Sequence, residues 1–175
     1  MTDWTSGYVA DIGYTYGFYR ELTPALLQAV TLSKGLSGPA SGAPITYCEL
    51  GCGQGFSANL LAAANPHVQY YANDFNPAHI VGAQALAGEG EVGNVHFYDD
   101  AFAEFLEREE LPQFDVISLH GIYSWIAPEH RATIVEFIKR KLKPGGLVYI
   151  SYNCLPGWAP AAPIRHLMYL HGKAQ

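Results

Sequence analysis

Residues 48–57 read CELGCGQGFS, with three glycines at alternate positions and a glutamate just ahead of them. The apolar residues 45–50 that lead into this stretch predict a buried strand, and the alanine- and leucine-rich residues 57–64 predict a helix. Glycine-rich turns between a strand and a helix commonly hold a nucleotide, since glycine lets the backbone approach a ligand. Most nucleotides place anionic phosphate groups against such a turn. Glu49 is therefore the residue that decides which ligand the turn can accept.

The composition is that of one globular domain. Hydrophobic residues make up 49% of the 175 residues, charged residues make up 15%, and the formal net charge is −6. A chain of this length buries about 70% of the surface that its unfolded form exposes. The acidic balance is unlike that of nucleic-acid-binding proteins, so we expect no nucleic acid as a partner. No apolar run approaches the ~20 residues of a membrane span, so we expect no membrane partner either.

The N-terminus and the cysteines indicate the cellular compartment. The first residues have neither the basic nor the apolar region of a signal peptide. The three cysteines are odd in number and form no CxxC pair, which is typical of a reducing compartment. We therefore expect a cytoplasmic protein without disulfides and without a metal site.

Strands and helices alternate along most of the chain. Strands are expected at 45–50, 68–72, 95–98, 114–119 and 147–152, and helices at 25–34, 57–64, 77–87, 102–108, 128–142 and from 159 onward. Such alternation produces βαβ units and a parallel sheet with helices on both faces. The expected fold is α/β, Rossmann-like and doubly wound, with a mostly parallel sheet of about five strands.

The same pattern divides the chain into three parts. Residues 1–44 are an aromatic N-terminal segment and a helix, which we expect to cap the ligand site. Residues 45–152 are the ligand-binding core, and residues 153–175 are a C-terminal segment with a helix. Among the N-terminal aromatics, Tyr14, Tyr16 and Tyr19 are candidates for a lid over the ligand.

The glycine spacing disfavours both common phosphate-binding loops. The dinucleotide fingerprint needs a glycine at its sixth position, which is Phe56 when counted from Gly51. The P-loop needs a lysine and then Ser or Thr after its last glycine, whereas Gly55 is followed by Phe-Ser. Glu49 would repel a diphosphate but attract an ammonium or sulfonium group, by about 4 kcal/mol at 4 Å. An NAD-linked oxidoreductase is therefore the weakest of the hypotheses.

Acidic side chains also follow the next two predicted strands. Asp74 lies about 20 residues after the glycine turn, where a carboxylate can accept from both hydroxyls of a ribose. Asp100 could accept from an adenine amino group, with Asp99 as the alternative; Asp74 and Asp100 could instead cap helices. A cofactor that is cationic near the turn and carries a ribose is S-adenosylmethionine.

These features resemble the class I S-adenosylmethionine-dependent methyltransferases, whose first motif is an acid followed by GxGxG. The resemblance covers about residues 45–152 and includes the PGG turn at 144–146. It implies a methyltransferase that uses S-adenosylmethionine and releases S-adenosylhomocysteine. The expected cofactor-binding residues lie in the glycine turn, at the strand ends and in the lid: Glu49, Gly51, Cys52, Gly53, Gly55, Asp74, Phe75, Asp100, Ala101, His120 and Tyr16.

A narrower resemblance rests on YTYGFYRELTP at 14–24 and SYNCLPGW at 151–158. Both stretches are similar to bacterial methyltransferases that carry an appended regulatory domain, some relatives of which modify protein lysines. Class I methyltransferases have seven strands, so the final two are missing from the expected sheet. Either the chain is a fragment of a longer protein with a further C-terminal domain, or another subunit of a homo-oligomer covers the sheet edge.

Two residues after the fourth predicted strand are catalytic candidates. His120 is the titratable side chain directly after this strand, and it is either a base or substrate contact or a structural histidine. Tyr123 is the second candidate, with a core aromatic as its alternative.

Absent motifs narrow the acceptor. The stretch HGIY lacks the Asp/Asn-Pro-Pro-Tyr motif of adenine methyltransferases and the aspartate of metal-dependent catechol methyltransferases. We therefore expect in-line methyl transfer to a small molecule or a protein side chain, without a metal. The alternative is a non-catalytic module that binds S-adenosylmethionine or S-adenosylhomocysteine, or a truncated core without turnover.

Overall fold

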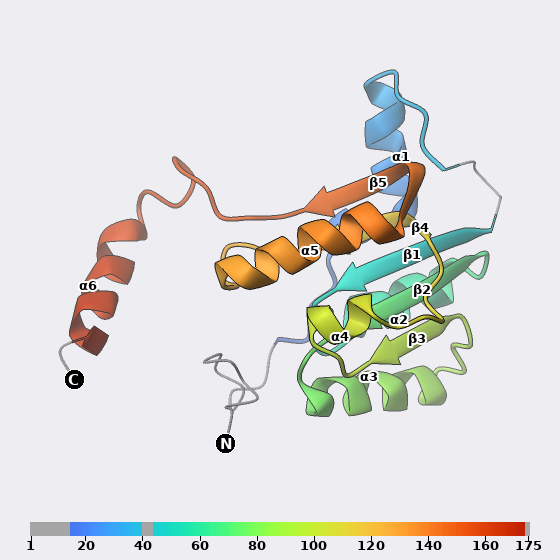
Figure 1. The fold of residues 1–175 in the computed structure, drawn as a ribbon, viewed down its shortest axis with the longest axis horizontal. Coiled ribbons are helices and arrows are strands. Elements are labelled where there is room, and N and C mark those ends of the chain that lie inside the picture. The colour runs from blue at the N-terminus through green and yellow to red at the C-terminus, as the bar shows by residue number, and fades with distance from the viewer. Residues whose placement is uncertain (1–14, 40–43, 174–175) are drawn as a thin grey trace.

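The computed structural model describes residues 15–39 and 44–173, so the predicted lid residue Tyr14 lies outside the described residues. In this part of the chain five strands form one parallel sheet in the order β3-β2-β1-β4-β5 (Figure 1). Their bounds are β1 Ile45–Leu50, β2 Val68–Asn73, β3 Val95–Tyr98, β4 Phe114–Leu119 and β5 Leu142–Ile150. The predicted Rossmann-like sheet is confirmed.

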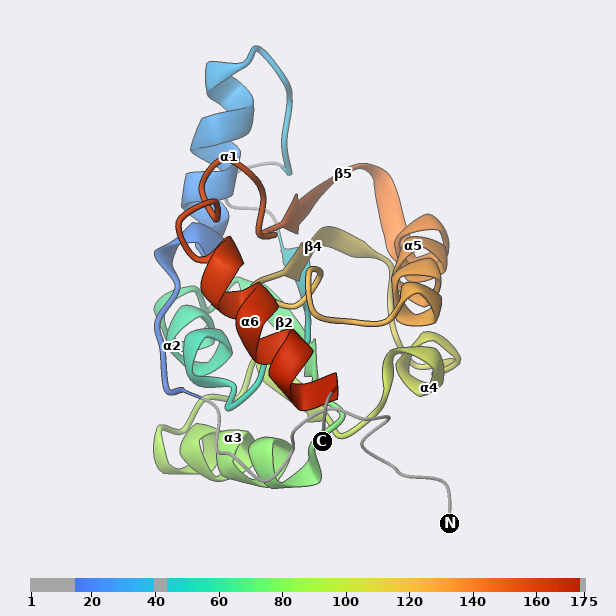
Figure 2. The ribbon, with the colours of Figure 1, turned by 90° about the vertical axis from the view of Figure 1, so that its left-hand side faces the viewer.

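Helices cover both faces of the sheet. Their bounds are η1 Arg20–Leu22, α1 Pro24–Ser33, α2 Phe56–Ala64, α3 Pro77–Glu89, α4 Phe102–Leu106, α5 Pro128–Lys141 and α6 Ala162–Lys173. Figure 2 shows α1, α2 and α3 on one side of the strands and α4 and α5 on the other. The fold is therefore doubly wound, as predicted.

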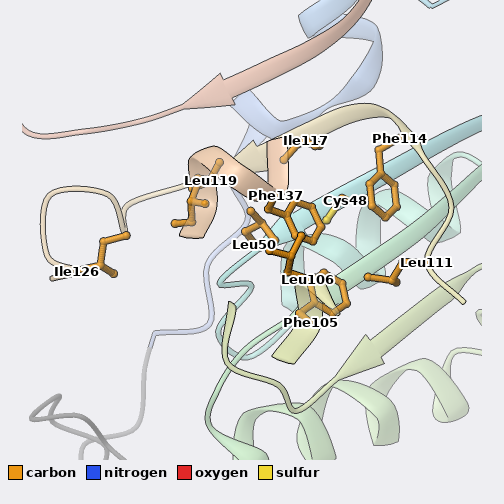
Figure 3. Close-up of a cluster of buried hydrophobic side chains, with 11 residues drawn as sticks. Cys48, Leu50, Phe105, Leu106, Leu111, Phe114, Ile117, Leu119, Ile126 and Phe137 are labelled. Carbon is orange, nitrogen blue, oxygen red and sulfur yellow. The ribbon is translucent and has the colours of Figure 1, made fainter. Parts of the chain in front are cut away.

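Each face of the sheet has its own core. On the α4/α5 face, Phe105 and Phe137 pack as stacked rings 5.5 Å apart over apolar residues of β1 and β4 (Figure 3). On the opposite face, Tyr47 and Tyr70 pack with Leu22 of η1. The Tyr47 hydroxyl donates to the Leu22 carbonyl at 2.9 Å, which ties η1 to the central strand. This bond fixes where the N-terminal segment reaches the sheet.

The last strand departs from its predicted bounds. We expected the PGG turn to end a helix and a strand to begin at residue 147, which was wrong. Pairing with β4 already begins at Leu142, then shifts register so that Val116 pairs with Leu147. Gly145 has a φ of 78°, and a Cβ on Gly146 would lie 3.0 Å from the Asp115 carbonyl oxygen. The glycines therefore form an irregularity inside β5 instead of a separate turn.

Candidate functional site

The strand order reverses between β1 and β4, and in such sheets ligands bind beyond the carboxyl ends of the strands at this point. The turn from β1 to α2 lies there. The N–H groups of Gly51 and Cys52 both donate to the Asn73 carbonyl at 2.9 Å, so the turn is anchored on the end of β2. Asn73 in turn donates from its side chain to the Asp100 carbonyl at 2.9 Å. The ends of β1, β2 and β3 are thus connected at one edge.

The glycines of this turn have conformations that other residues rarely adopt. Gly51, Gly53 and Gly55 have φ values of 72°, 55° and 66°. A Cβ on Gly55 would lie 2.5 Å from the Ala83 Cβ, and one on Gly51 would lie 2.9 Å from the Ile122 Cδ1. Gly51 and Gly55 are therefore required both by backbone conformation and by close packing.

Asp74 connects the glycine turn to the start of α3. Its Oδ2 accepts from the Gly53 N–H at 3.0 Å, and its Oδ1 accepts from the Asn76 N–H at 3.0 Å. His79 Nδ1 lies 3.1 Å from the same Oδ1. The cap of α3 is Asn76, whose side chain accepts from Ala78 N, so Asp74 is not the helix cap. Because a carboxylate offers about four acceptor positions, one remains for a ligand hydroxyl.

Glu49 is buried, with 5% of its surface exposed. Burial raises the pKa of its carboxyl group to about 8, and the negative charge of Asp74 acts in the same direction. At neutral pH the carboxyl group is therefore largely protonated until a cation comes close. The predicted attraction between Glu49 and a cationic group therefore takes another form, because the negative charge of Glu49 forms together with binding of the cation.

Asp100 is held by an arginine that the sequence analysis did not single out. The Nε and Nη2 atoms of Arg108 both donate to the Asp100 carboxylate, and Nη1 donates to Glu110 at 2.9 Å. The guanidinium group lies over the Tyr98 ring, 4.9 Å from its centroid. Asp100 is buried whereas its alternative Asp99 is exposed. The Ala101 N–H is capped by the Glu104 side chain at 2.9 Å.

His120 lies between two tyrosines. Its ring stacks on Tyr19 with centroids 4.2 Å apart, and its Nδ1 is 3.2 Å from the Tyr149 hydroxyl. Burial lowers the pKa of the imidazole below its usual 6.5, although the charge of Glu21 opposes this. Tyr149 could not be assigned from the sequence, because its distance from His120 depends on the pairing of β4 with β5.

The N-terminal segment crosses the start of α2. Ser57 Oγ accepts from the Tyr19 N–H at 3.0 Å and donates to the Gly17 carbonyl at 2.9 Å. The exposed ring of Tyr16 meets Phe56 edge-on, with centroids 6.1 Å apart. Both described lid candidates therefore lie at the glycine-turn edge.

Three other candidates lie in less distinctive surroundings. Tyr123 packs against the α4/α5 core, with the Arg131 guanidinium 5.4 Å from its ring centroid. Cys52 makes a sulfur contact of 3.7 Å with the Gly53 carbonyl, and burial raises the pKa of its thiol. Phe75 is half-buried beside Asp74.

In residues 15–39 and 44–173, no three His, Cys, Asp or Glu side chains gather in a way that could hold a metal ion. Among the described helices, none has the length and apolar character needed to cross a membrane.

Comparison with known proteins places this chain in a family. Residues 48–148 match the methyltransferase domain family. The chain is 55% identical to the uncharacterized protein sll1526 of Synechocystis over 97% of its own length, and it spans 33% of that relative. It is 29% identical to the malonyl-[acyl-carrier protein] O-methyltransferase of Paenibacillus over 60% of its length and 38% of that protein.

A solved structure resembles the whole described fold. PKMT2 from Rickettsia typhi, determined in complex with AdoHcy, matches 92% of this chain with a TM-score of 0.81 and 27% identity. The match covers 30% of that protein, so the chain spans about a third of the length of both PKMT2 and sll1526. Together with the family match over more than half of the sequence, these similarities confirm the resemblance predicted from the glycine turn. The chain belongs to the class I S-adenosylmethionine-dependent methyltransferase family.

Proposed function

We propose that this domain binds S-adenosylmethionine and catalyses transfer of its methyl group to a small molecule or a protein side chain. The observation that carries the proposal is the connected edge formed by the glycine turn, Glu49, Asp74 and Asp100. The relative PKMT2, which shares this fold, binds AdoHcy. The family match supports the same cofactor.

The residues at this edge fit the parts of the cofactor. We propose that the backbone of the glycine turn holds the methionine portion; Gly51 and Gly55 give the turn its shape, because their Cβ positions are taken by Ile122 and Ala83. Asp74 retains one acceptor position, which we assign to a ribose hydroxyl. We assign Asp100, which is buried and held by Arg108, to the adenine amino group. Glu49 gains its negative charge when a cationic group arrives. We propose that Phe75 and Ala101 contact the adenine and that Tyr16 covers the bound cofactor.

The bound cofactor supplies a methyl group that is already activated for in-line displacement. The protein therefore needs mainly to align an acceptor with it, which can supply roughly 7–11 kcal/mol of the barrier. Burial lowers the pKa of His120, which favours the neutral imidazole. A neutral imidazole can take a proton from an acceptor that arrives protonated, so we propose His120 as the base or the acceptor contact. Tyr123 is the weaker catalytic candidate, since it packs against the core.

The net charge and the cysteines support two further proposals, on the acceptor and on the cellular location. The net charge of −6 favours a small-molecule or protein acceptor over a nucleic acid. All three cysteines are unpaired, which supports a cytoplasmic location.

Calorimetry tests cofactor binding. We expect the chain to bind S-adenosylmethionine and S-adenosylhomocysteine and not NAD, and binding of NAD alone would refute the proposal. A screen for methyl transfer to amines, hydroxyls, thiols and lysine peptides then tests turnover. Cofactor binding without transfer to any class would favour the alternative, a module that binds the cofactor without catalysis.

A further inference from the structure

His79 stands in a hydrogen-bonded row between Asp74 and Asn76. Its Nδ1 lies 3.1 Å from Asp74 Oδ1, and its Nε2 lies 3.4 Å from Asn76 Nδ2. The side chains of His79 and Asp74 are 12% and 9% exposed, so water competes little for these contacts. Neither His79 nor Asn76 is needed by the methyl-transfer chemistry proposed above.

The direction of every bond in the row is determined by a backbone amide. The Ala78 N–H can only donate, and it donates to Asn76 Oδ1 at 3.0 Å. The other end of the Asn76 amide is therefore its NH2 group, which faces His79 Nε2 and donates to it. An imidazole nitrogen that accepts carries no proton, so the proton of the neutral ring is on Nδ1. This Nδ1–H then donates to Asp74 Oδ1.

The row holds the Asp74 carboxylate from the side opposite to the glycine turn. Oδ1 accepts from both His79 and the Asn76 N–H, which fills its two acceptor positions. Oδ2 accepts from the Gly53 N–H and keeps one position. The carboxylate can turn neither away from Gly53 nor toward α3 without losing a buried hydrogen bond.

We propose that His79 is a positioning residue, which fixes Asp74 so that its remaining acceptor position meets one hydroxyl of the cofactor ribose. This inference rests on the proposed function, because positioning of Asp74 affects binding only if the ligand carries a ribose. The row uses His79 Nδ1–H as a donor, and Asn76 sets that tautomer by donating to Nε2.

Nitrogen NMR of the 175-residue chain tests the row without any ligand. We expect the His79 proton on Nδ1 and not on Nε2, with the signal identified by its loss in His79→Asn. In Asn76→Asp, which still caps α3, a carboxylate oxygen replaces the NH2 group and can accept from an Nε2–H, so we expect the wild-type tautomer to be lost. A wild-type protein with the proton on Nε2 would overturn the proposal.

Binding measurements test the link to the ribose. The probes are S-adenosylhomocysteine and its 2′-deoxy and 3′-deoxy analogues, titrated by calorimetry. We expect the wild type to lose about tenfold in affinity, about 1.4 kcal/mol, when the hydroxyl that Asp74 accepts is absent. His79→Leu removes the donor to Asp74. This variant should bind S-adenosylhomocysteine and that deoxy analogue with nearly equal affinity, while its affinity for the deoxy analogue stays close to that of the wild type. His79→Asn keeps an N–H at the Nδ1 position and should retain the discrimination.

The outcomes separate the two proposals. If the wild type fails to bind S-adenosylhomocysteine, the proposed function is wrong. If the wild type binds and discriminates but His79→Leu weakens the parent and the deoxy compound equally, His79 only supports the fold and the positioning role is refuted.

Discussion

Among the single residues of the site, Glu49 is the one whose charge depends most on what is bound. Its pKa is about 8 without a ligand, because burial and the nearby Asp74 both disfavour the charged form. A bound cation favours the charged form and lowers this pKa, so binding releases a proton. Affinity for S-adenosylhomocysteine should therefore rise with pH between about 6 and 8, by up to tenfold per pH unit, and level off above.

Calorimetry in buffers of different ionisation enthalpy measures that proton release. The matched variant Glu49→Gln keeps the shape of the side chain but cannot ionise, so its affinity should vary much less over the same pH range. Equal pH dependence of the wild type and Glu49→Gln would show that another group carries the linkage.

Gly55 is the second residue for which the structure makes a specific prediction, which concerns the stability of the domain. Its φ of 66° and a Cβ position 2.5 Å from Ala83 and 2.8 Å from the Phe97 ring exclude any side chain without movement. Gly55→Ala should lower the free energy of unfolding by about 2–4 kcal/mol, from the left-handed backbone and from overpacking. Urea unfolding measures this loss.

Gly88 is the matched control for that substitution. It lies inside α3, and a Cβ there would meet nothing within 4 Å. Gly88→Ala should leave stability unchanged or raise it by up to about 1 kcal/mol, because alanine favours helix. A Gly55→Ala variant as stable as Gly88→Ala would contradict the packing described for the glycine turn.

Among the elements, the stretch from Gly17 to Tyr19 is bonded to α2 through one buried hydroxyl. Ser57 Oγ bonds both Gly17 and Tyr19, and no other hydrogen bond of similar burial joins this segment to α2 in the described chain. Ser57→Ala leaves the Tyr19 N–H without its acceptor, at a cost of about 1–3 kcal/mol. We expect faster hydrogen exchange at residues 17–22 and roughly tenfold weaker binding of S-adenosylhomocysteine.

Ser33→Ala is the control, because the exposed Ser33 hydroxyl donates only to the Val30 carbonyl within the same helix, α1. Its exchange pattern and affinity should match the wild type. Unchanged exchange in Ser57→Ala would mean that stacking of Tyr19 on His120 is sufficient to hold the segment.

The accuracy of the predicted elements follows the strength of their sequence signals. The bounds of β1, β3 and β4 were predicted correctly, because apolar runs between turn residues define buried strands well. The start of β5 was not, because a PGG stretch signals a turn and the sequence does not show that a neighbouring strand pairs across it. Helix α4 ends at Leu106, two residues earlier than predicted.

The residues at the candidate site also divide into those that the sequence predicted and those that it did not. The location of the glycines, Glu49, Asp74 and Asp100 at one edge of the sheet was predictable, because each lies at or just after the end of a predicted strand and the carboxyl ends of parallel strands share an edge. His79, Arg108 and Tyr149 were not predicted. Each contacts a predicted site residue, and the tertiary structure, not a sequence motif, brings each pair together. His79 lay within reach of sequence reasoning, since it falls in the first turn of the helix that Asp74 precedes.

Across the whole molecule, stability is concentrated in the two cores beside the sheet. The C-terminal helix α6 lies apart from the sheet in Figure 1. Its apolar side chains are mostly exposed, including Ile164 at 61%, Leu167 at 68% and Met168 at 69%. Because burial of apolar surface is the main stabilising contribution, α6 adds little to the free energy of unfolding of the domain.

Removal of residues 161–175 should therefore leave the domain folded. This deletion keeps Trp158, whose ring meets Trp125 with centroids 6.2 Å apart. We expect the Tm to change by less than about 2 °C and the affinity for S-adenosylhomocysteine to stay within twofold, whereas Phe137→Ala in the core should cost about 3–5 kcal/mol. Scanning calorimetry and titration measure both. A fall in Tm comparable to that of Phe137→Ala would mean that α6 packs onto the domain in solution, where its exposed apolar face would find a partner within the same chain.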